Sequence, residues 1–322
     1  MEGRIESKME VKMENKIEGG VENIFSYWSL HDGEKELEPL KFSNGKTQED
    51  VVKEIVEAIK GNGKDKEKQK IVFLHGMCGT GKSAIALNVA RALGRSSIAV
   101  PVKALQRQYK EDYTEKLSVN GKNGKKMKIS VITGRDNHDS TYWPGVSCAD
   151  PLLPENIKMT DKNFVKIKEY YGQNPYISNK EIPDVRGMTR VAVAPANPYW
   201  SPIVAEDVFM PLKDAKKKKY RGLSGRDFIF YHRKTGCSYY DQYEGYFDSD
   251  LIIFNAAKYK IEVALDRKPE TEIDIIDEAD EFLDSFSNQI DLNLNKLFNS
   301  LSSMHFDDLD VQGTMELIKK LI

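Results

Sequence analysis

Short apolar runs alternate with amphipathic segments at the two ends of this sequence. The runs are typical of strands that are buried on both faces, and they occupy residues 71–76, 97–102, 250–255 and 272–277. Helical periodicity covers residues 47–60, 83–94 and 104–113. Thr47 is placed to cap the first of these helices, and Gly94 to end the second. The order of strand and helix predicts an α/β fold with a parallel sheet.

The pattern loosens between residues 114 and 245, where Lys, Gly, Asn, Pro and aromatic residues dominate. Strand candidates there are short, such as residues 128–133. We interpret this stretch as an irregular inserted domain. Residues 23–113 and 246–287 then form one interrupted domain, followed by a helical C-terminal segment at 288–322. Residues 1–22 alternate in charge, which favours a strand or a disordered segment over a helix.

A phosphate-binding loop follows the first apolar run. The sequence GMCGTGKS at residues 76–83 fits G-x-x-x-x-G-K-[ST], between a predicted strand and a predicted helix as that motif requires. We expect Lys82 to reach the β- and γ-phosphates of ATP, and Ser83 to ligate Mg²⁺. The nucleotide-binding residues predicted in this loop are Gly76, Gly79, Thr80, Gly81, Lys82 and Ser83.

A carboxylate cluster follows the last apolar run, with the sequence DEAD at residues 277–280. Parallel sheets place ligands at the carboxyl ends of their strands. Asp277 is therefore predicted to hold Mg²⁺, Glu278 to orient and deprotonate the attacking water, and Asp280 to report the nucleotide state. The alternative is a solvated turn or a helix cap, and the pairing with a phosphate loop favours the catalytic interpretation.

The two motifs together resemble those of superfamily 2 helicases, and the segments between them resemble the XPD/DinG family. These segments are AVPVKALQRQ at 99–108, GRDN at 134–137, CSYYDQY at 237–243 and DLIIFN at 250–255. The resemblance spans about residues 40–290. It implies a RecA-like P-loop NTPase domain, with residues 99–108 gripping single-stranded DNA. Gln48 then corresponds either to a glutamine that reads adenine or to a surface residue at a helix start.

The cysteines depart from the pattern of this family, whose iron–sulfur cluster needs four thiolates. The insertion holds only Cys148 and Cys237, because Cys78 belongs to the phosphate loop. Ser140 and Asn197 stand where cysteines would be expected. We therefore expect no cluster, although a mixed site with His138 or His232 stays open. Three distant cysteines make no disulfide framework and favour a reducing, cytoplasmic setting.

Composition limits the classes of partner that the protein could bind. With 48 basic and 50 acidic residues the formal net charge is −2, which excludes a histone-like polycation. No apolar run reaches 18 residues, so we expect no membrane span. The insertion carries basic and aromatic residues that could contact single-stranded or forked DNA, or could simply be a solvated surface. They are Lys122, Lys125, Lys126, Lys128, Tyr142, Trp143, Tyr199, Trp200, Lys213, Lys216, Lys217, Lys218, Lys219, Arg221, Tyr239 and Tyr240.

These features predict ATP hydrolysis coupled to DNA. No second phosphate-clamping segment or arginine finger follows Asp280. We therefore expect weak ATPase activity from the chain by itself, with the other motor domain on a second polypeptide. The alternatives are a non-catalytic module that binds ATP and DNA, and one half of a split or truncated helicase.

Overall fold

A four-stranded parallel sheet lies at the centre of the computed structural model, which describes residues 26–61, 70–77, 79–178, 184, 187–284, 286, 298 and 309–321. Its strands are β3 (Ser96–Val100), β5 (Ile129–Ile132), β9 (Leu251–Asn255) and β10 (Ile273–Ile276). They lie in the order β10-β3-β9-β5, and each neighbouring pair is parallel. The predicted α/β fold with a parallel sheet is thus confirmed.

The helices that accompany this sheet follow the sequence pattern closely. Three of them were predicted, α1 (Gln48–Lys60), α2 (Lys82–Leu93) and α3 (Lys103–Lys110), which continues as a π-helix over Glu111–Lys116. A fourth, α8 (Ala256–Ala264), was not predicted. Thr47 caps α1 through a reciprocal capping box with Asp50, as polar residues at these positions favour. Gly94 ends α2 with a positive φ of 129°.

The predicted strand at residues 71–76 is wrong. Residues 70–77 form no helix or strand, and Ile71 and Phe73 are each 81% exposed. A strand needs a neighbour to satisfy its backbone groups. Among the described residues, nothing pairs with this segment or with the outer edge of β10. A short apolar run gives the same sequence signal whether or not its partner is present, so the pattern could not reveal this difference.

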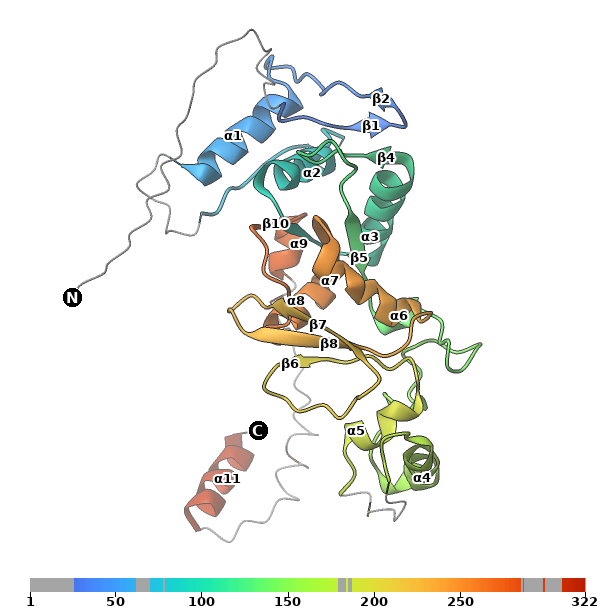
Figure 1. Ribbon diagram of the computed structural model, residues 1–322. Coiled ribbons are helices and arrows are strands. Elements are labelled where there is room, and N and C mark those ends of the chain that lie inside the picture. Colours follow the sequence, from blue (N-terminus) through green and yellow to red (C-terminus); the bar gives the residue numbers. More distant parts are fainter. Residues whose placement is uncertain are drawn as a thin grey trace, which may run out of the picture.

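The chain between β5 and β9 has more regular structure than its sequence indicated. It forms an antiparallel sheet, β6-β8-β7, in the lower half of Figure 1. Its elements are α4 (Phe164–Gln173), α5 (Arg190–Val193), β6 (Ile203–Ala205), β7 (Lys216–Arg221), β8 (Asp227–His232), α6 (Ser238–Asp241) and α7 (Gly245–Asp248). Single-turn 3-10 helices lie at Arg135–Asn137, Asp161–Asn163, Ala194–Ala196 and Gln242–Glu244. The strand β5, which the sequence pattern placed with this stretch, pairs with β9 in the parallel sheet.

Strand β9 joins the two main hydrophobic clusters. Its side chains alternate between the faces of the sheet, as in any strand. Leu251 and Ile253 pack with α1 and α2, whereas Ile252 and Phe254 pack with aromatic residues of β7, β8, α6 and α7. The β6-β8-β7 region therefore shares a core with the second face of the parallel sheet.

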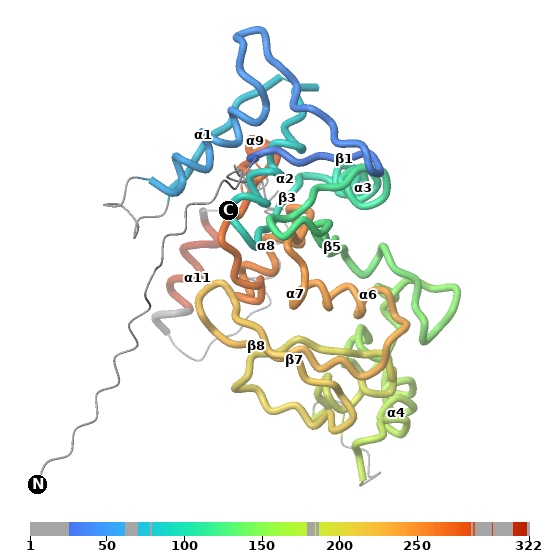
Figure 2. Tube along the Cα trace, turned by 45° about the horizontal axis from the view of Figure 1, so that its top comes forward, coloured from blue at the N-terminus to red at the C-terminus, as the bar shows by residue number. Residues whose placement is uncertain are grey.

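The remaining described elements lie at the periphery. A small sheet combines β1 (His31–Asp32), β2 (Lys35–Glu36) and β4 (Leu117–Ser118), and two helices follow β10, α9 (Ala279–Asp284) and α11 (Leu309–Leu321). Helices α1 and α4 lie far apart in both Figure 1 and Figure 2. Residues 1–22 and most of the apolar positions predicted as helical within 288–322 lie outside the described residues. No helix in the described part of the chain has the length and apolar character needed to cross a bilayer.

Candidate functional site

The glycine-rich loop connects the exposed segment 70–77 to the N-terminus of α2. Gly79 and Gly81 adopt φ values of 82° and 72°, in the left-handed region that favours glycine. The Thr80 hydroxyl donates to the Met77 carbonyl at 2.8 Å, and Lys82 Nζ donates to the Gly76 carbonyl at 3.0 Å. Cys78 lies outside the described residues. Such a loop at a helix N-terminus offers backbone N–H groups and positive potential to a phosphate.

Gln48 supports this loop from behind. Its Nε2 donates to the Thr80 carbonyl at 2.9 Å, while its Oε1 accepts from the Leu40 backbone N–H at 2.9 Å. The side chain is only 2% exposed, so the interpretation of Gln48 as a surface residue is wrong. The positive φ of Gly81 favours glycine there, and a Cβ at this position would also displace the Gln48 amide from the loop. Recognition of adenine by Gln48 stays a prediction.

The acidic motif lies against the same loop. The Asp277 backbone N–H donates to the Ala99 carbonyl at 2.9 Å, which extends the pairing of β10 with β3 by one residue. Glu278 then turns with a φ of 50°, in the left-handed region. Its Oε1 lies 3.7 Å from Lys82 Nζ. The fold thus brings together two charged residues that are far apart in the sequence.

Tyr109 of α3 is a member of this site that the sequence analysis missed. Its hydroxyl donates to Asp277 Oδ2 at 2.8 Å, and the Asp277 Oδ1 accepts from the Glu278 backbone N–H at 3.2 Å. The Ser83 hydroxyl interacts with the hydroxyls of Tyr109 and Tyr113. Burial raises the pKa of both tyrosines, that of Tyr113 to about 12, so both remain donors at neutral pH. Helical periodicity places Tyr109 on a buried face, but it cannot name its partner.

The site offers oxygen ligands of the kind that Mg²⁺ prefers. Ser83 and Asp277 supply a hydroxyl and a carboxylate, and Asp277 contacts Tyr109. Mg²⁺ at a nucleotide site uses one or two protein oxygens together with phosphate oxygens and water. The described residues contain no cluster of three or more His, Cys, Asp or Glu side chains that could hold a metal. A magnesium site of this kind needs no such cluster, so the donor set fits Mg²⁺.

An open cavity of about 750 Å³ lies beside α3 and the end of β5. Three of the side chains that line it are cationic, Lys103, Arg107 and Lys110. Lys103 forms an ion pair with Asp136 at the rim. His138 also lines the cavity, and burial lowers its pKa, which favours the neutral ring at pH 7. The cavity could therefore accept a polyanion.

The basic runs of the insertion are partly neutralised. Lys218 pairs with Glu244, and Lys219 with Glu206 and Asp227. Lys128 pairs with Asp248. Among the aromatic candidates, Trp200, Tyr239 and Tyr240 are buried in the hydrophobic core, so they cannot stack on bases without unfolding. The prediction that these three aromatic residues face DNA is wrong, because aromatic character marks cores as well as binding surfaces.

The two cysteines of the insertion face each other. Their Sγ atoms are 3.9 Å apart, and both residues are buried. Asn197 donates to Glu155 Oε1 at 2.9 Å instead of facing the thiols as a ligand would. The two histidines considered for a mixed site bind elsewhere. His232 lies between Asp241 and Glu244, at 2.9 and 2.8 Å, and His138 lies between Thr133 and Ser238.

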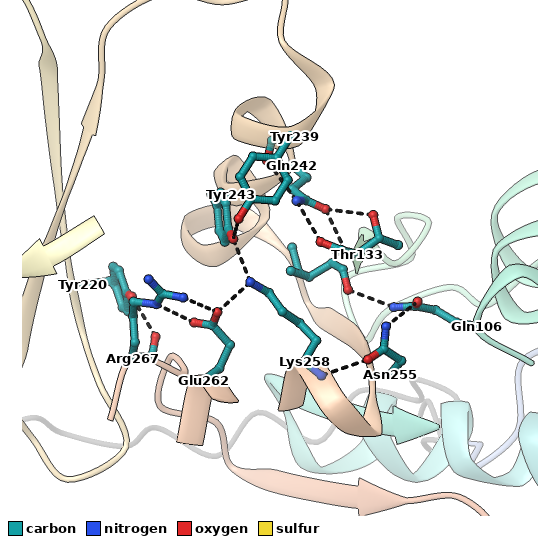
Figure 3. A network of polar contacts seen from close by, with 11 residues as sticks. Gln106, Thr133, Tyr220, Tyr239, Gln242, Tyr243, Asn255, Lys258, Glu262 and Arg267 are labelled. Carbon is teal, nitrogen blue, oxygen red and sulfur yellow. Dashed lines mark hydrogen bonds and ion pairs between the residues drawn. The ribbon is translucent and has the colours of Figure 1, made fainter. Parts of the chain in front are cut away.

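A buried polar network ties the insertion to the parallel sheet (Figure 3). Gln106 Nε2 donates to the Ile132 and Ile253 carbonyls, at 2.9 and 3.2 Å, and Asn255 donates to Gln106 Oε1 at 3.4 Å. On the far side of β9, Lys258 Nζ contacts the Tyr243 hydroxyl at 2.8 Å and Glu262 at 2.8 Å. Glu262 is fully buried and also binds Arg267 at 2.6 Å. These contacts fix the positions of α3, β5, β9 and α8 relative to one another.

A parallel sheet with a glycine-rich loop opening a helix, and an acidic turn after an adjoining strand, defines a P-loop ATPase domain. Residues 41–180 match the family described as "Type III restriction enzyme, res subunit", a helicase-like domain of this superfamily. The RecA-like fold class predicted from the sequence is therefore confirmed. The match includes the phosphate loop and α3 but not residues 277–280, and it does not single out the XPD/DinG branch. The comparisons found no matching curated protein and no matching solved structure.

Proposed function

We propose that the protein is an XPD/DinG-like ATP hydrolase, corresponding to the N-terminal motor part of a DNA helicase. One observation carries the proposal: the phosphate-loop Lys82 and the acidic-motif Glu278 approach to 3.7 Å although the sequence separates them widely. A chance glycine-rich turn would have no reason to meet a carboxylate at the end of a neighbouring strand. The matched helicase-like family supports the same class of activity.

The roles of the residues follow from their positions. Backbone N–H groups of residues 79–83 would bind phosphate oxygens, and Lys82 would exchange its contacts with Gly76 and Glu278 for the γ-phosphate. Ser83 and Asp277 would hold Mg²⁺, which when bound neutralises charge on the phosphate oxygens. Glu278, released from Lys82, would orient and deprotonate the attacking water.

A second motor domain is part of this proposal. We assign residues 23–113 and 246–287 to the first motor, with residues 114–245 as the insertion except where β5 joins the sheet. The partner domain would supply the arginine finger and the closing motion. The exposed apolar side chains of Ile71, Val72, Phe73 and Leu74 support a partner near the phosphate loop, because such patches are common at interaction sites. A second polypeptide could carry this domain.

We place single-stranded or forked DNA at the cavity beside α3. Lys103, Arg107 and Lys110 recur at i, i+4 and i+7 along this helix, so they form one cationic stripe. Such a stripe suits the phosphates of a single strand. The basic residues of β7 are the weaker candidates because several of them already have acidic partners.

We expect Arg107→Ala to weaken binding of single-stranded DNA about equally for all sequences. Loss of one phosphate contact would also reduce the slope of log K against log salt by about 0.7 to 1. Fluorescence anisotropy at several salt concentrations measures both quantities. Lys216→Ala, which removes an exposed charge from β7, is the matched control. An equal effect of both variants would contradict the binding of DNA at the cavity.

A steady-state ATPase assay, with and without single-stranded DNA, tests the proposed function. We expect slow turnover that DNA stimulates and that Lys82→Ala abolishes. Nucleotide binding without turnover in the wild-type protein would instead favour the rival function, a non-catalytic module that binds ATP and DNA. Unwinding of forked DNA by the purified chain alone would contradict the need for a second motor domain.

The predictions about the cluster and the compartment remain open to direct test. We infer that no iron–sulfur cluster is bound, since the insertion has two cysteines where such a cluster needs four thiolates. Near-stoichiometric four-iron content after anaerobic purification would overturn this inference. The reducing, cytoplasmic setting that the cysteine content favours stays a prediction.

A further inference from the structure

Helix α3 has two functional faces. The exposed side chains of Lys103, Arg107 and Lys110 line the cavity together with the buried Gln106, while Tyr109 is buried in the core that the helix shares with the parallel sheet. Gln106 fixes the buried side of the helix by donating to the carbonyls of Ile132 and Ile253. The helix therefore lies between the cavity and the carboxyl edge of the sheet, and it has polar contacts with both.

Tyr109 is the point at which α3 reaches the ATP site. Its hydroxyl donates to Asp277 Oδ2 of the acidic motif at 2.8 Å. Burial raises its pKa, and Ser83 of the phosphate loop is near enough to lower that pKa slightly. A carboxylate oxygen can accept a hydrogen bond and still bind a cation, because it has two lone pairs. The phenol can therefore orient Asp277 without occupying the metal position.

We propose that Tyr109 is a positioning residue that orients Asp277 for Mg²⁺ and makes the metal site sensitive to nucleic acid bound along the cationic stripe of α3. This inference rests on the proposed function. Tyr109 contacts Asp277 at 2.8 Å and directly precedes Lys110, the last residue of the cationic stripe. A strand bound along the stripe would compete with Asp136 for Lys103, at the start of the helix that carries the phenol.

Metal binding gives a readout independent of turnover. We expect Tyr109→Phe to weaken binding of Mn²⁺, used as a paramagnetic substitute for Mg²⁺, to the full chain with ADP by about 10- to 100-fold, as loss of a supporting residue typically does. Electron paramagnetic resonance of free Mn²⁺ measures this affinity. Tyr199→Phe is the matched control, since it removes the hydroxyl of a half-buried tyrosine that packs against the core of the insertion. Mn²⁺ affinity unchanged by Tyr109→Phe would overturn the proposal.

The response to nucleic acid is tested in the same titration. Single-stranded DNA should change the Mn²⁺ affinity of the wild-type protein and leave that of Tyr109→Phe unchanged. A response retained in full by Tyr109→Phe would refute the coupling. If the affinity for Mn²⁺ with ADP depends on Tyr109 but the wild-type protein never hydrolyses ATP, the proposed function fails while the positioning role stands.

A double-mutant cycle with Asp277→Asn separates positioning from a loss of stability. If Tyr109 acts through Asp277, its substitution should add nothing to the loss of Mn²⁺ affinity that Asp277→Asn already causes. A fully additive loss would contradict the proposal even where Tyr109→Phe lowers the melting temperature. The cycle therefore remains decisive for a partly destabilised variant.

Discussion

Glu278→Gln is expected to lower the rate of ATP turnover by about 10²- to 10⁴-fold, the usual contribution of a general base. Glutamine keeps the size of the side chain but cannot take a proton from water. It also loses the charge that lies 3.7 Å from Lys82, so nucleotide binding should be retained. Phosphate release measures turnover, and titration with a fluorescent nucleotide measures binding.

Glu281→Gln provides the control for this change. Glu281 is an exposed acidic residue in the first turn of α9, three positions after Glu278. We expect its substitution to leave turnover unchanged. Equal turnover in Glu278→Gln and the wild-type protein would remove Glu278 from the mechanism, even if Lys82→Ala remains inactive.

Glu262→Ala is expected to lower the free energy of unfolding by about 3–5 kcal/mol, the usual cost of removing one partner of a buried ion pair. The change leaves Lys258 and Arg267 without their shared carboxylate, in a network where Glu262 is fully buried. Urea denaturation of the full chain measures the loss. Glu270→Ala is the control, because Glu270 is exposed and its ion pair with Arg221 is long, at 3.9 Å. We expect this substitution to change the free energy of unfolding by less than about 0.5 kcal/mol.

The effect of Glu262→Ala should depend on pH. Burial by itself would raise the pKa of Glu262, but hydrogen bonds and charges from Arg267 and Lys258 outweigh it, so the pKa is lowered from its ordinary value of 4.5. A carboxyl whose pKa is lowered by folding contributes stability above its unfolded pKa and loses it in acid. The wild-type protein should therefore lose its advantage over the variant as the pH falls below about 4.5. A gap that widens in acid would contradict this account of the network.

Much of the motor fold could be predicted because its signals are local. The capping box of Thr47 and Asp50 and the apolar runs of β3, β9 and β10 each occupy a few consecutive residues. The phosphate loop is also local, since glycines at fixed spacing meet a conformational need within the loop itself. The fold class followed from the order of these elements along the chain.

The failed predictions and the undetected site residue all depend on contacts between distant residues. Phe73 sits in an apolar run, and only the missing neighbour strand distinguishes its exposed position from a buried one. The role of Tyr109 depends on Asp277, which is 168 positions away. Tyr239 and Tyr240 resemble base-stacking residues in sequence, yet the core formed with Phe254 buries them. Periodicity records the face on which a residue lies, but it does not record what covers that face.

The backbone of Glu278 has a thermodynamic consequence. A residue other than glycine with a φ of 50° stores about 1–3 kcal/mol of strain, which glycine at the same position would relieve. The most stable residue at position 278 is thus one without a carboxylate. Selection for stability alone would remove this side chain, and a screen for thermostable variants would tend to recover inactive proteins altered at this residue.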